Sequence, residues 1–497
     1  MKSILSARQM RECDHSTIAH GTSSAVLMQR AGFAVYQALI NNFDISNTLI
    51  ICGSGNNGGD GFIVALYLKR AGYSCDIWYV GDGHAMTEEC EKRFNECVDA
   101  DIPFVESPLL FEYSAIVDAI FGTGLSSSPE GLSKTAIEAV KTSGIPVISI
   151  DIPSGISADT GISLGSFIRA DVTVAIQAFK IGHILSDGID ASGKLICADI
   201  GIDTSYAVCT DSVTPFSVED TDLKLIPRRK RDSHKGNYGR VLVIAGSTEM
   251  CGAAYLSAAA AYRTGAGIVE IFTAKENRTA LCTLLPEAII TSYDTDTDIY
   301  KLLTKSIDRA TVIVIGPGIG TSDIAKRIVA KTYEISNSPI IIDADALNIT
   351  ASEGFSYPNE VPVIITPHPM ELSRLTKKSV KELTNDIWGS AIKYAKENGI
   401  ICVSKYSRTV ITDGEAIFVN TSGGPSMAKG GSGDVLCGII AGLLCSGVSP
   451  IEAASLGVYI HGRAGDITQN ELGQYSPVAR DILEKIPHVL KKAGGRE

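Results

Sequence analysis

Short runs of β-branched residues alternate with longer helical patterns along most of this 497-residue chain. In the first part of the chain, such runs are found in segments 48–53, 75–80, 115–122, 146–153 and 172–176. Helical patterns separate the first four runs, and this alternation is typical of a parallel sheet with helices on both faces. The first part of the chain is therefore predicted to be a three-layer α/β sandwich.

A second series of the same kind follows after a break in the pattern. Its apolar runs lie in segments 240–246, 267–273, 311–318, 339–345, 361–367, 400–405 and 409–414, with Ala-rich helical stretches such as 252–267 between them. Segment 205–233 between the two series mixes polar residues, two prolines and the basic run Arg228–Arg231, which we interpret as a solvated face. We therefore predict two α/β domains, residues 1–215 and 216–497. The two series share no obvious motif, which favours fusion over duplication.

Charge and composition narrow the environment and the partners. Lys and Arg total 44 against 56 Asp and Glu, a net charge of −12, so nucleic acid is not an expected partner. The richest apolar run, 435–448, is too short to span a membrane and predicts a buried helix. The 12 cysteines are scattered without a Cys-x-x-Cys pair, and the N-terminus has no secretory pattern. We expect a cytoplasmic protein without a membrane partner.

A glycine cluster follows the first predicted strand. Residues 53–58 read Gly-Ser-Gly-Asn-Asn-Gly and match G-x-G-x-x-G between a strand and a helix. Glycines there let the backbone approach a pyrophosphate at a helix N-terminus, although they can also serve only tight packing. A Rossmann dehydrogenase needs an acidic residue at the end of the next strand. The candidate here is Asp82, which lies beyond a glycine. A conventional hydride-transfer domain is therefore not predicted.

Carboxylates and amides accumulate at the same predicted edge. Asn56, Asn57 and Asp60 lie on the glycine loop, and Asp118 and Asp151 end later strands. A second glycine turn, 122–124, follows Asp118. Strand carboxyl ends form the ligand crevice of an open parallel sheet, so these groups are expected to converge. Each aspartate alone could be a turn former, but carboxylates beside a phosphate imply an intervening cation or hydroxyl.

The strongest single pattern is the second glycine cluster, residues 430–434 (GGSGD), directly before the apolar run 435–448. Several backbone N–H groups could point at one anion there and stabilise the charge that develops in phosphoryl transfer. Asp434 could accept the proton of an attacking hydroxyl, as kinase aspartates do, or could only cap the helix. No G-x-x-x-x-G-K-[ST] motif is present, so a P-loop enzyme is excluded.

The first half resembles a known enzyme domain. The motifs GNNGGDG (55–61), DAIFGTGL (118–125), DIPSG (151–155), ADTG (158–161) and Lys180-Ile181-Gly182 are similar to those of the epimerase domain of NAD(P)H-hydrate repair enzymes. This family interconverts the R and S forms of hydrated NADH and NADPH at the 6-hydroxyl. The resemblance implies a Rossmann-like fold, Asp151 as the acid/base, and a potassium ion held by Asn57, Asp118 and Ser154.

The resemblance also implies a set of contacts with the hydrated nucleotide. These are Asn56, Asn57, Gly58, Gly59, Asp60, Gly122, Thr123, Gly124, Leu125, Ser126, Ser127, Ser128 and Asp151.

The second half resembles a ribokinase-like enzyme. Besides GGSGD, the segments 234–247, 252–267, 315–320 (IGPGIG), 343–348 (DADALN), 366–372 (TPHPMEL) and 461–466 (HGRAGD) are similar to those of the ADP- or ATP-dependent NAD(P)H-hydrate dehydratases. That family transfers a phosphoryl group to the hydroxyl of the S-hydrate, and loss of phosphate restores the dihydronicotinamide. The resemblance implies Asp434 as the base, Gly431 to Gly433 as the anion hole, and Mg²⁺ on the donor phosphates.

Two further groups of residues are implied by the same resemblance. The hydrate site would comprise Ala253, Gly318, Gly320, His368 and Asp434. The nucleotide donor, ADP or ATP, would contact Lys405, Tyr406, Ser407, Arg408, Thr409, Gly431, Ser432 and Gly433. The chain departs from the family pattern at Tyr406 and Met370, where a glycine is usual.

Fusion of the two activities has a chemical reason, because hydration produces both C6 epimers and a kinase-like pocket should accept one. Two other classes stay open at this point. One is a vitamin or sugar kinase whose first domain senses nucleotides, and the other is a binding protein that only senses redox nucleotides. Partners are expected to be the hydrated nucleotides and the donor, and the chain is expected to form a homo-oligomer.

Overall fold

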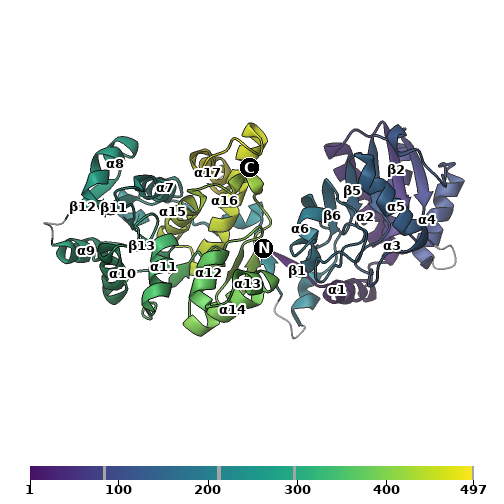
Figure 1. The fold of residues 1–497 in the computed structure, drawn as a ribbon. Coiled ribbons are helices and arrows are strands. Elements are labelled where there is room, and N and C mark those ends of the chain that lie inside the picture. The colour runs from purple at the N-terminus through teal and green to yellow at the C-terminus, as the bar shows by residue number, and fades with distance from the viewer. Residues whose placement is uncertain (82–85, 210–213, 295–297, 495–497) are drawn as a thin grey trace. The chain divides into compact units, whose positions relative to one another are not determined.

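A computed structural model of the chain describes residues 1–81, 86–209, 214–294 and 298–494. The structure divides into two compact units, Lys2–Pro215 and Phe216–Glu497, with Met1 grouped with the second (Figure 1). Each unit is described by itself. Asp82, which bore on the dehydrogenase hypothesis, lies outside the described residues.

The first unit is built on a parallel sheet. Its strands, in spatial order, are β3 (Ser74–Tyr79), β2 (Asn47–Cys52), β4 (Ala115–Ala119), β5 (Val147–Ile150), β6 (Val172–Ile176) and β8 (Lys194–Ala198). Its helices are α1 (Ala7–Ala19), α2 (Ser24–Asn42), α3 (Asn56–Arg70), α4 (Glu88–Asp99), α5 (Gly131–Ser143) and α6 (Gly188–Ala191). Two short strands, β1 (Lys2–Leu5) and β7 (Phe179–Lys180), pair in parallel with each other and are not part of this sheet. The five apolar runs of the first series are thus confirmed as strands.

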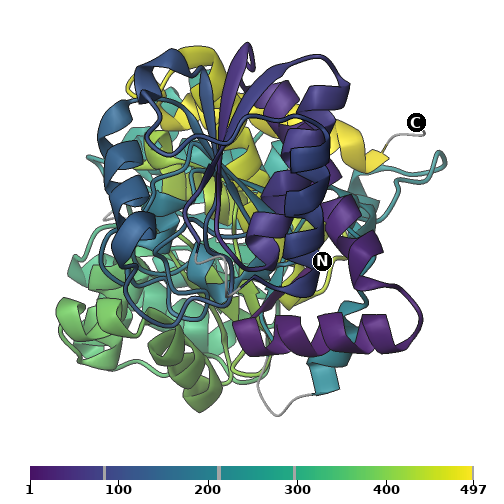
Figure 2. The ribbon, with the colours of Figure 1, turned by 90° about the vertical axis from the view of Figure 1, so that its right-hand side faces the viewer.

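Both faces of this sheet are buried, which explains why its strands are apolar at consecutive positions. Ile50 and Cys52 pack with α2, α3 and α4, whereas Leu49 and Ile51 pack with α5. Figure 2 shows the strands between these helices. The predicted three-layer sandwich is therefore confirmed, and the carboxyl ends of β2, β4 and β5 meet at one edge.

The second unit is also a three-layer sandwich, with a longer sheet. Its strands, in order, are β12 (Ile289–Tyr293), β11 (Ile268–Ala274), β10 (Arg240–Ile244), β13 (Val312–Ile315), β14 (Ile340–Ile342), β15 (Val363–Ile365), β16 (Ile401–Ser404), β17 (Val410–Thr412), β18 (Ile417–Val419) and β9 (Phe216–Ser217). Its helices are α7 (Cys251–Arg263), α8 (Arg278–Leu284), α9 (Ile299–Ile307), α10 (Asp323–Ile335), α11 (Ala344–Glu353), α12 (Pro369–Thr376), α13 (Val380–Asn385), α14 (Ile387–Asn398), α15 (Ser432–Cys445), α16 (Pro450–Leu472) and α17 (Ala479–Gly494).

The second series of apolar runs is confirmed as strands, with one difference in topology. β16 pairs antiparallel with β17, and β17 pairs antiparallel with β18, without intervening helices. The segment after β16 was predicted as a further βα unit, and that prediction is wrong, because a short connection can join only antiparallel neighbours. β9 lies within the segment interpreted as a connection and extends the sheet.

Two observations bear on the environment predictions. The cysteine side chains described by the structure are free thiols. None of the helices in the described ranges combines the length and apolar character that a membrane span requires.

The apolar run 435–448 is confirmed as most of the buried helix α15, which packs closely on α7. A Cβ at Gly438 would lie 2.1 Å from the Ser257 carbonyl oxygen and 2.6 Å from the Ala260 Cβ. At Gly442 it would lie 2.6 Å from the Thr264 Cβ. The two helix backbones therefore touch, and the glycines of α15 are required by this contact.

We expect Gly438→Ala to lower the free energy of unfolding of the second unit by about 1–3 kcal/mol, because the added methyl overpacks the α7–α15 contact. Gly252→Ala in α7 is the matched control, since a Cβ there meets no heavy atom within 4 Å. The control should leave stability unchanged or raise it by up to about 1 kcal/mol. Denaturation followed by Trp388 fluorescence in a Trp78→Phe background measures both, and equal stabilities for the two variants would contradict the expectation.

Candidate active sites at the strand ends of the two units

In the first unit, helix α3 begins without a side-chain cap. Its N-cap is Gly55, and no side chain bonds the N–H groups of its first turn, which can therefore meet an anion. A Cβ at Gly53 would lie 2.1 Å from the Ile120 carbonyl oxygen, and one at Gly58 would lie 2.0 Å from that of Gly53. At Gly55 nothing lies within 4 Å. Packing thus explains two glycines of G-x-G-x-x-G, and the open position of Gly55 suits a ligand.

The three residues expected to hold potassium come from the first turn of α3 (Asn57), the end of β4 (Asp118) and the loop after β5 (Ser154). The Asp118 carboxylate is fully buried and accepts hydrogen bonds from Ser154 Oγ (2.6 Å), Ser149 Oγ (2.7 Å) and Ser154 N (2.9 Å). Burial, opposed by these hydrogen bonds, raises the pKa of Asp118. Asn57 Oδ1 is 3.2 Å from a Cβ built on Gly122. The N–H of the preceding residue, Phe121, donates to Ser154 Oγ at 2.9 Å, so Asn57 and Ser154 contact the same loop. Among the described residues, Asp118 has neutral donors only.

Asp151, the candidate acid/base, lies at the end of β5 in a left-handed backbone conformation (φ 65°). Its Oδ1 accepts hydrogen bonds from Lys180 Nζ at 2.5 Å and from Ile176 N at 3.1 Å. Its carbonyl oxygen is 2.7 Å from His183 Nε2. Lys180 and His183 were not predicted as site residues, although Lys180 begins one of the quoted motifs.

Two more carboxylates lie close to the Asp151–Lys180 pair. Burial, together with the charges of Asp151 and of Asp14 on α1, raises the pKa of Asp60 on α3 well above its usual value. Burial also raises the pKa of Asp14. No spacing rule could have brought Asp14 into this site, because it comes from a different part of the chain and has no motif around it. The structure therefore collects three carboxylates and one buried lysine.

The predicted contact loop after β4 lies at the surface. Gly124, Ser126, Ser127 and Ser128 are exposed, and Gly122, Thr123 and Leu125 are partly exposed. A Cβ at Gly124 meets nothing within 4 Å. Asn56 is exposed and accepts a hydrogen bond from Thr87 Oγ1 at 2.7 Å. The hydrate contacts on this loop stay predictions.

In the second unit, helix α15 begins in the same manner as α3. Its N-cap is Gly431 in the left-handed region (φ 90°), and no side chain caps the first turn. The interpretation of Asp434 as a helix cap is therefore wrong. The N–H groups at this helix start can meet an anion, in agreement with the predicted anion hole at Gly431 to Gly433.

Asp434 has the properties of a general base. Burial and the nearby charge of Asp343, opposed by Lys405, raise the pKa of Asp434 to about 7. Such a carboxylate can take a proton near neutral pH and exists in both protonation states there. The Ser257 hydroxyl of α7 donates to the Asp434 carbonyl oxygen at 3.0 Å and fixes the first turn of α15.

A partly buried ion pair lies beside the start of α15. Lys405 Nζ is 2.8 Å from Asp343 Oδ1, and a Cβ built on Gly433 would lie 3.2 Å from Lys405 Nζ. Burial alone would raise the pKa of Asp343, but Lys405 outweighs it and holds that pKa below its usual value. Lys405 therefore keeps a positive charge at the helix start. Asp343 lies in the quoted DADALN motif but was not predicted as a site residue.

His368 has a structural role. It is the N-cap of α12, and its Nδ1 accepts a hydrogen bond from Met370 N at 3.1 Å. Its Nε2 is 3.2 Å from Glu371 Oε1, and burial raises the pKa of Glu371 to about 7. The imidazole is half exposed, so its predicted contact with the hydrate stays a prediction.

The other predicted hydrate contacts of this unit are brought together. A Cβ at Gly318 would lie 3.0 Å from the Ala253 Cβ, and Gly320 N donates to Asp345 Oδ2 at 2.9 Å. Asp345 also raises the pKa of Asp434, so this loop faces the base.

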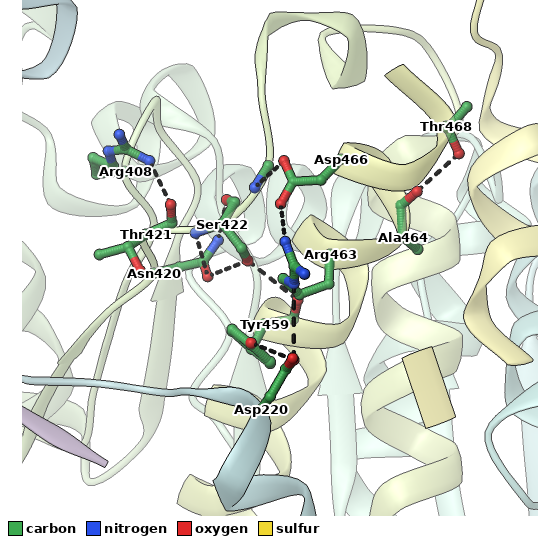
Figure 3. Close-up of polar contacts among 11 residues, drawn as sticks. Asp220, Arg408, Asn420, Thr421, Ser422, Tyr459, Arg463, Ala464, Asp466 and Thr468 are labelled. Carbon is green, nitrogen blue, oxygen red and sulfur yellow. Dashed lines mark hydrogen bonds and ion pairs between the residues drawn. The ribbon is translucent and has the colours of Figure 1, made fainter. Parts of the chain in front are cut away.

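The predicted donor segment, residues 405–409, runs beside the loop that leads into GGSGD (Figure 3). Arg408 Nη1 donates to the Thr421 carbonyl oxygen at 2.9 Å, and Asn420 N donates to Thr409 O at 2.9 Å. Gly423 N donates to Asp466 Oδ1 at 3.0 Å.

On α16, Arg463 Nη1 is 3.1 Å from Asp466 Oδ2 (Figure 3). Tyr406 and Ser407 are exposed. Lys405 thus lies beside Gly433, whereas Arg408 and Thr409 support the loop through hydrogen bonds with residues 420 and 421. The nucleotide contacts stay predictions.

A three-layer α/β unit with an uncapped helix start, a carboxylate whose pKa is raised to about 7 and a lysine–aspartate ion pair is typical of a ribokinase-like phosphoryl-transfer enzyme, here joined to a Rossmann-like unit. The comparisons agree with this class. The family model described as NAD(P)H-hydrate dehydratase matches residues 241–488, and that described as YjeF-related protein N-terminus matches residues 24–182.

Curated relatives span both units. The bifunctional NAD(P)H-hydrate repair enzyme of Coxiella burnetii is 36% identical and covers 97% of both chains. That of Escherichia coli is 34% identical over 93% of this chain and 89% of its own. The chain belongs to the family of bifunctional NAD(P)H-hydrate repair enzymes.

Solved structures match the second unit. The ADP/ATP-dependent NAD(P)H-hydrate dehydratase of Bacillus subtilis, co-crystallised with ATP/Mg²⁺, is 32% identical and covers 57% of this chain and 100% of its own, with a TM-score of 0.51. A ribokinase-like superfamily protein of Enterococcus faecalis is 32% identical over 56% of this chain and 96% of its own, with a TM-score of 0.52. The predicted ribokinase-like fold is confirmed.

The glycine geometry of the first unit yields a prediction. Gly53→Ala should lower the free energy of unfolding by about 1–3 kcal/mol, because its methyl meets the Ile120 backbone. Gly55→Ala should leave stability within about 0.5 kcal/mol of the parent but weaken binding of the hydrated nucleotide. Denaturation followed by Trp78 fluorescence in a Trp388→Phe background, together with the KM for epimerisation, measures both. A stable Gly53→Ala variant would contradict the packing argument.

Proposed function

We propose that the two units carry out successive steps in the repair of hydrated nicotinamide nucleotides. The first unit interconverts the R and S forms of the hydrate at C6. The second unit dehydrates the S form to NADH or NADPH at the expense of ADP or ATP. The observation that supports this most strongly is the uncapped start of α15, where Asp434, with a pKa of about 7, lies near the Lys405–Asp343 pair.

The dehydration begins with phosphoryl transfer. Asp434 accepts the proton of the C6 hydroxyl while the hydroxyl oxygen bonds to the terminal phosphorus of the donor. The bridging P–O bond of the donor breaks in the same step. The backbone N–H groups of Gly431 to Gly433 and the Lys405 ammonium stabilise the charge on the transferred group. Phosphate then leaves C6 with its bonding electron pair, the N1 lone pair forms a C6–N1 double bond, and loss of a C5 proton restores the dihydronicotinamide.

The epimerisation rests on the chemistry of C6, which carries both a hydroxyl and the ring nitrogen. Asp151 accepts the hydroxyl proton, the C6–N1 bond opens with its electron pair on nitrogen, and an aldehyde forms. Reclosure on the other face of the carbonyl inverts C6 and returns the proton. Asp60, whose pKa burial raises well above its usual value, is the carboxyl group proposed to exchange a proton with the ring nitrogen.

A potassium ion suits the first unit. Asn57, Asp118 and Ser154 offer oxygen ligands, which a hard cation prefers. Asp118 is a fully buried carboxylate with neutral donors only among the described residues, so a cation there would balance its charge. The ion would allow phosphate oxygens to approach this acidic edge.

The donor and the assembly are further parts of the proposal. ADP is proposed as the donor with ATP as the alternative, because the similar Bacillus subtilis enzyme is an ADP/ATP-dependent NAD(P)H-hydrate dehydratase. Mg²⁺, when bound, would neutralise the donor phosphates. A homo-oligomer and the absence of nucleic-acid partners stay predictions.

Separate removal of the two carboxylates tests the assignment. Asp434→Asn should lower dehydration of the S-hydrate by about 10²–10⁴-fold, because the general base is lost, and should leave epimerisation intact. Asp151→Asn should do the reverse. The assays are recovery of dihydronicotinamide absorbance with ADP or ATP, and chromatographic separation of the epimers without a donor. A stable phosphorylated product would instead support the vitamin or sugar kinase.

The pH dependence provides a second test. Because Asp434 must be ionised to act as the base, dehydration should rise as the pH passes upward through about 7. Lys405 lowers the pKa of Asp434 and Asp343 raises it. Lys405→Met should therefore move this limb of the pH–rate profile to higher pH, and Asp343→Asn should move it to lower pH. Shifts in the same direction, or no shift, would contradict the electrostatic assignment.

A further inference from the structure

The backbone of Asp151 is held in a conformation that aspartate rarely adopts. Its φ of 65° lies in the left-handed region, although the residue directly follows a buried strand. Asp151 N donates to Val174 O at 2.8 Å on the neighbouring strand β6. Such strain persists only where surrounding contacts maintain it, and it is common at functional sites.

His183 supplies two of those contacts. The imidazole is fully buried, and its Nδ1 accepts a hydrogen bond from Lys180 N at 2.9 Å. Its other nitrogen, Nε2, therefore carries the proton and donates to the Asp151 carbonyl oxygen at 2.7 Å. One neutral side chain thus links the backbone of Asp151 to that of Lys180.

Lys180 acts on the carboxylate itself. Its side chain is 1% exposed, and Nζ donates to Asp151 Oδ1 at 2.5 Å and to the Ile176 carbonyl oxygen at 2.7 Å. Ile176 N also donates to Oδ1 at 3.1 Å. Among the described residues, Asp151 Oδ2 has no hydrogen-bond partner, so one oxygen is fixed and the other is left for a substrate.

The surrounding charges make this lysine necessary. The titratable groups around Asp151 are Lys180 of β7, His183, which follows it, and Asp60 of α3; Asp14 of α1 lies near Asp60 and Lys180. Two of these are carboxylates in addition to Asp151, and a buried cation among several carboxylates offsets their mutual repulsion. Within the described part of the chain, Lys180 is the cation paired with Asp151.

We propose that Lys180 and His183 are positioning residues for the epimerisation, Lys180 by pairing with the Asp151 carboxylate and His183 by holding its strained backbone. Oδ1 is then fixed, and Oδ2 meets the C6 hydroxyl. This inference rests on the epimerase activity proposed for the first unit. It assigns roles to two residues that contact Asp151 and not the substrate.

The first experiment compares Lys180→Met with Lys180→Arg in the full-length chain. Epimerisation is measured against pH without a nucleotide donor, so that dehydration does not proceed. Lys180→Met should lower kcat by about 10²-fold or more and move the acidic limb of the profile to higher pH, because Asp151 loses the cation that favours its charge. Lys180→Arg should keep the limb in place. Lys134→Met, at an exposed lysine of the same unit, is the control.

The second experiment separates His183 from general stability. His183→Gln can still accept from Lys180 N and donate to Asp151 O, whereas His183→Leu can do neither. His183→Gln should keep most of kcat, and His183→Leu should lose it with little change in KM and no shift of the pH limb. This pair decides the proposal if Lys180→Met fails to fold.

The outcomes distinguish the inference from the function on which it rests. A wild-type chain that does not interconvert the epimers overturns the proposed function. An active wild-type chain with an unmoved limb in Lys180→Met, or with equal activity in His183→Gln and His183→Leu, overturns the positioning roles.

Discussion

The chemistry of both units depends on one constraint, which is that a buried carboxylate beside an anion site needs a cation to hold its charge. In the first unit Lys180 pairs with Asp151 itself, and in the second Lys405 pairs with Asp343, a neighbour of the base. The difference matters, because Asp151 has its own cation whereas Asp434 feels Lys405 only in competition with Asp343. Two different α/β folds thus place one lysine among several acids at the carboxyl ends of their strands.

The helix starts complete each site. Both α3 and α15 begin at a glycine without a side-chain cap, so the N–H groups that a serine or aspartate would satisfy face the crevice. The missing side-chain caps lower the intrinsic stability of each helix start, and hydrogen bonds from these N–H groups to ligand oxygens can restore it. Tight backbone packing compensates, through Gly53 and Gly58 in the first unit and through Gly438 in the second.

The sequence predicted much of this arrangement, and the parts it missed have a physical reason. Buried parallel strands leave continuous apolar runs, so the sheets, the two units and the buried helix α15 could be foreseen. Glycine–aspartate clusters at strand ends located Asp151 and Asp434. The ion-pair partners could not be foreseen from the sequence. Lys180 is 29 residues from Asp151, and Asp343 is 62 residues from Lys405, so each pair meets only because of the order of the strands in the sheet. Asp14 has no motif at all. The antiparallel β16–β17 pairing was missed because a short apolar run has the same pattern in either direction.

The contact between α7 and α15 has a consequence for substrate choice. Ala253 lies near the start of α7 and Asp434 near the start of α15, and the two helices meet backbone to backbone at Gly438 and Gly442. No flexible side chain separates the helix axes there, so core packing fixes the spacing between the starts of α7 and α15. In the proposed dehydratase, this fixed spacing limits the size of the alcohol substrate, and side-chain movements alone cannot make room for a bulkier one. A new substrate specificity would have to evolve through the loops around the two helix starts.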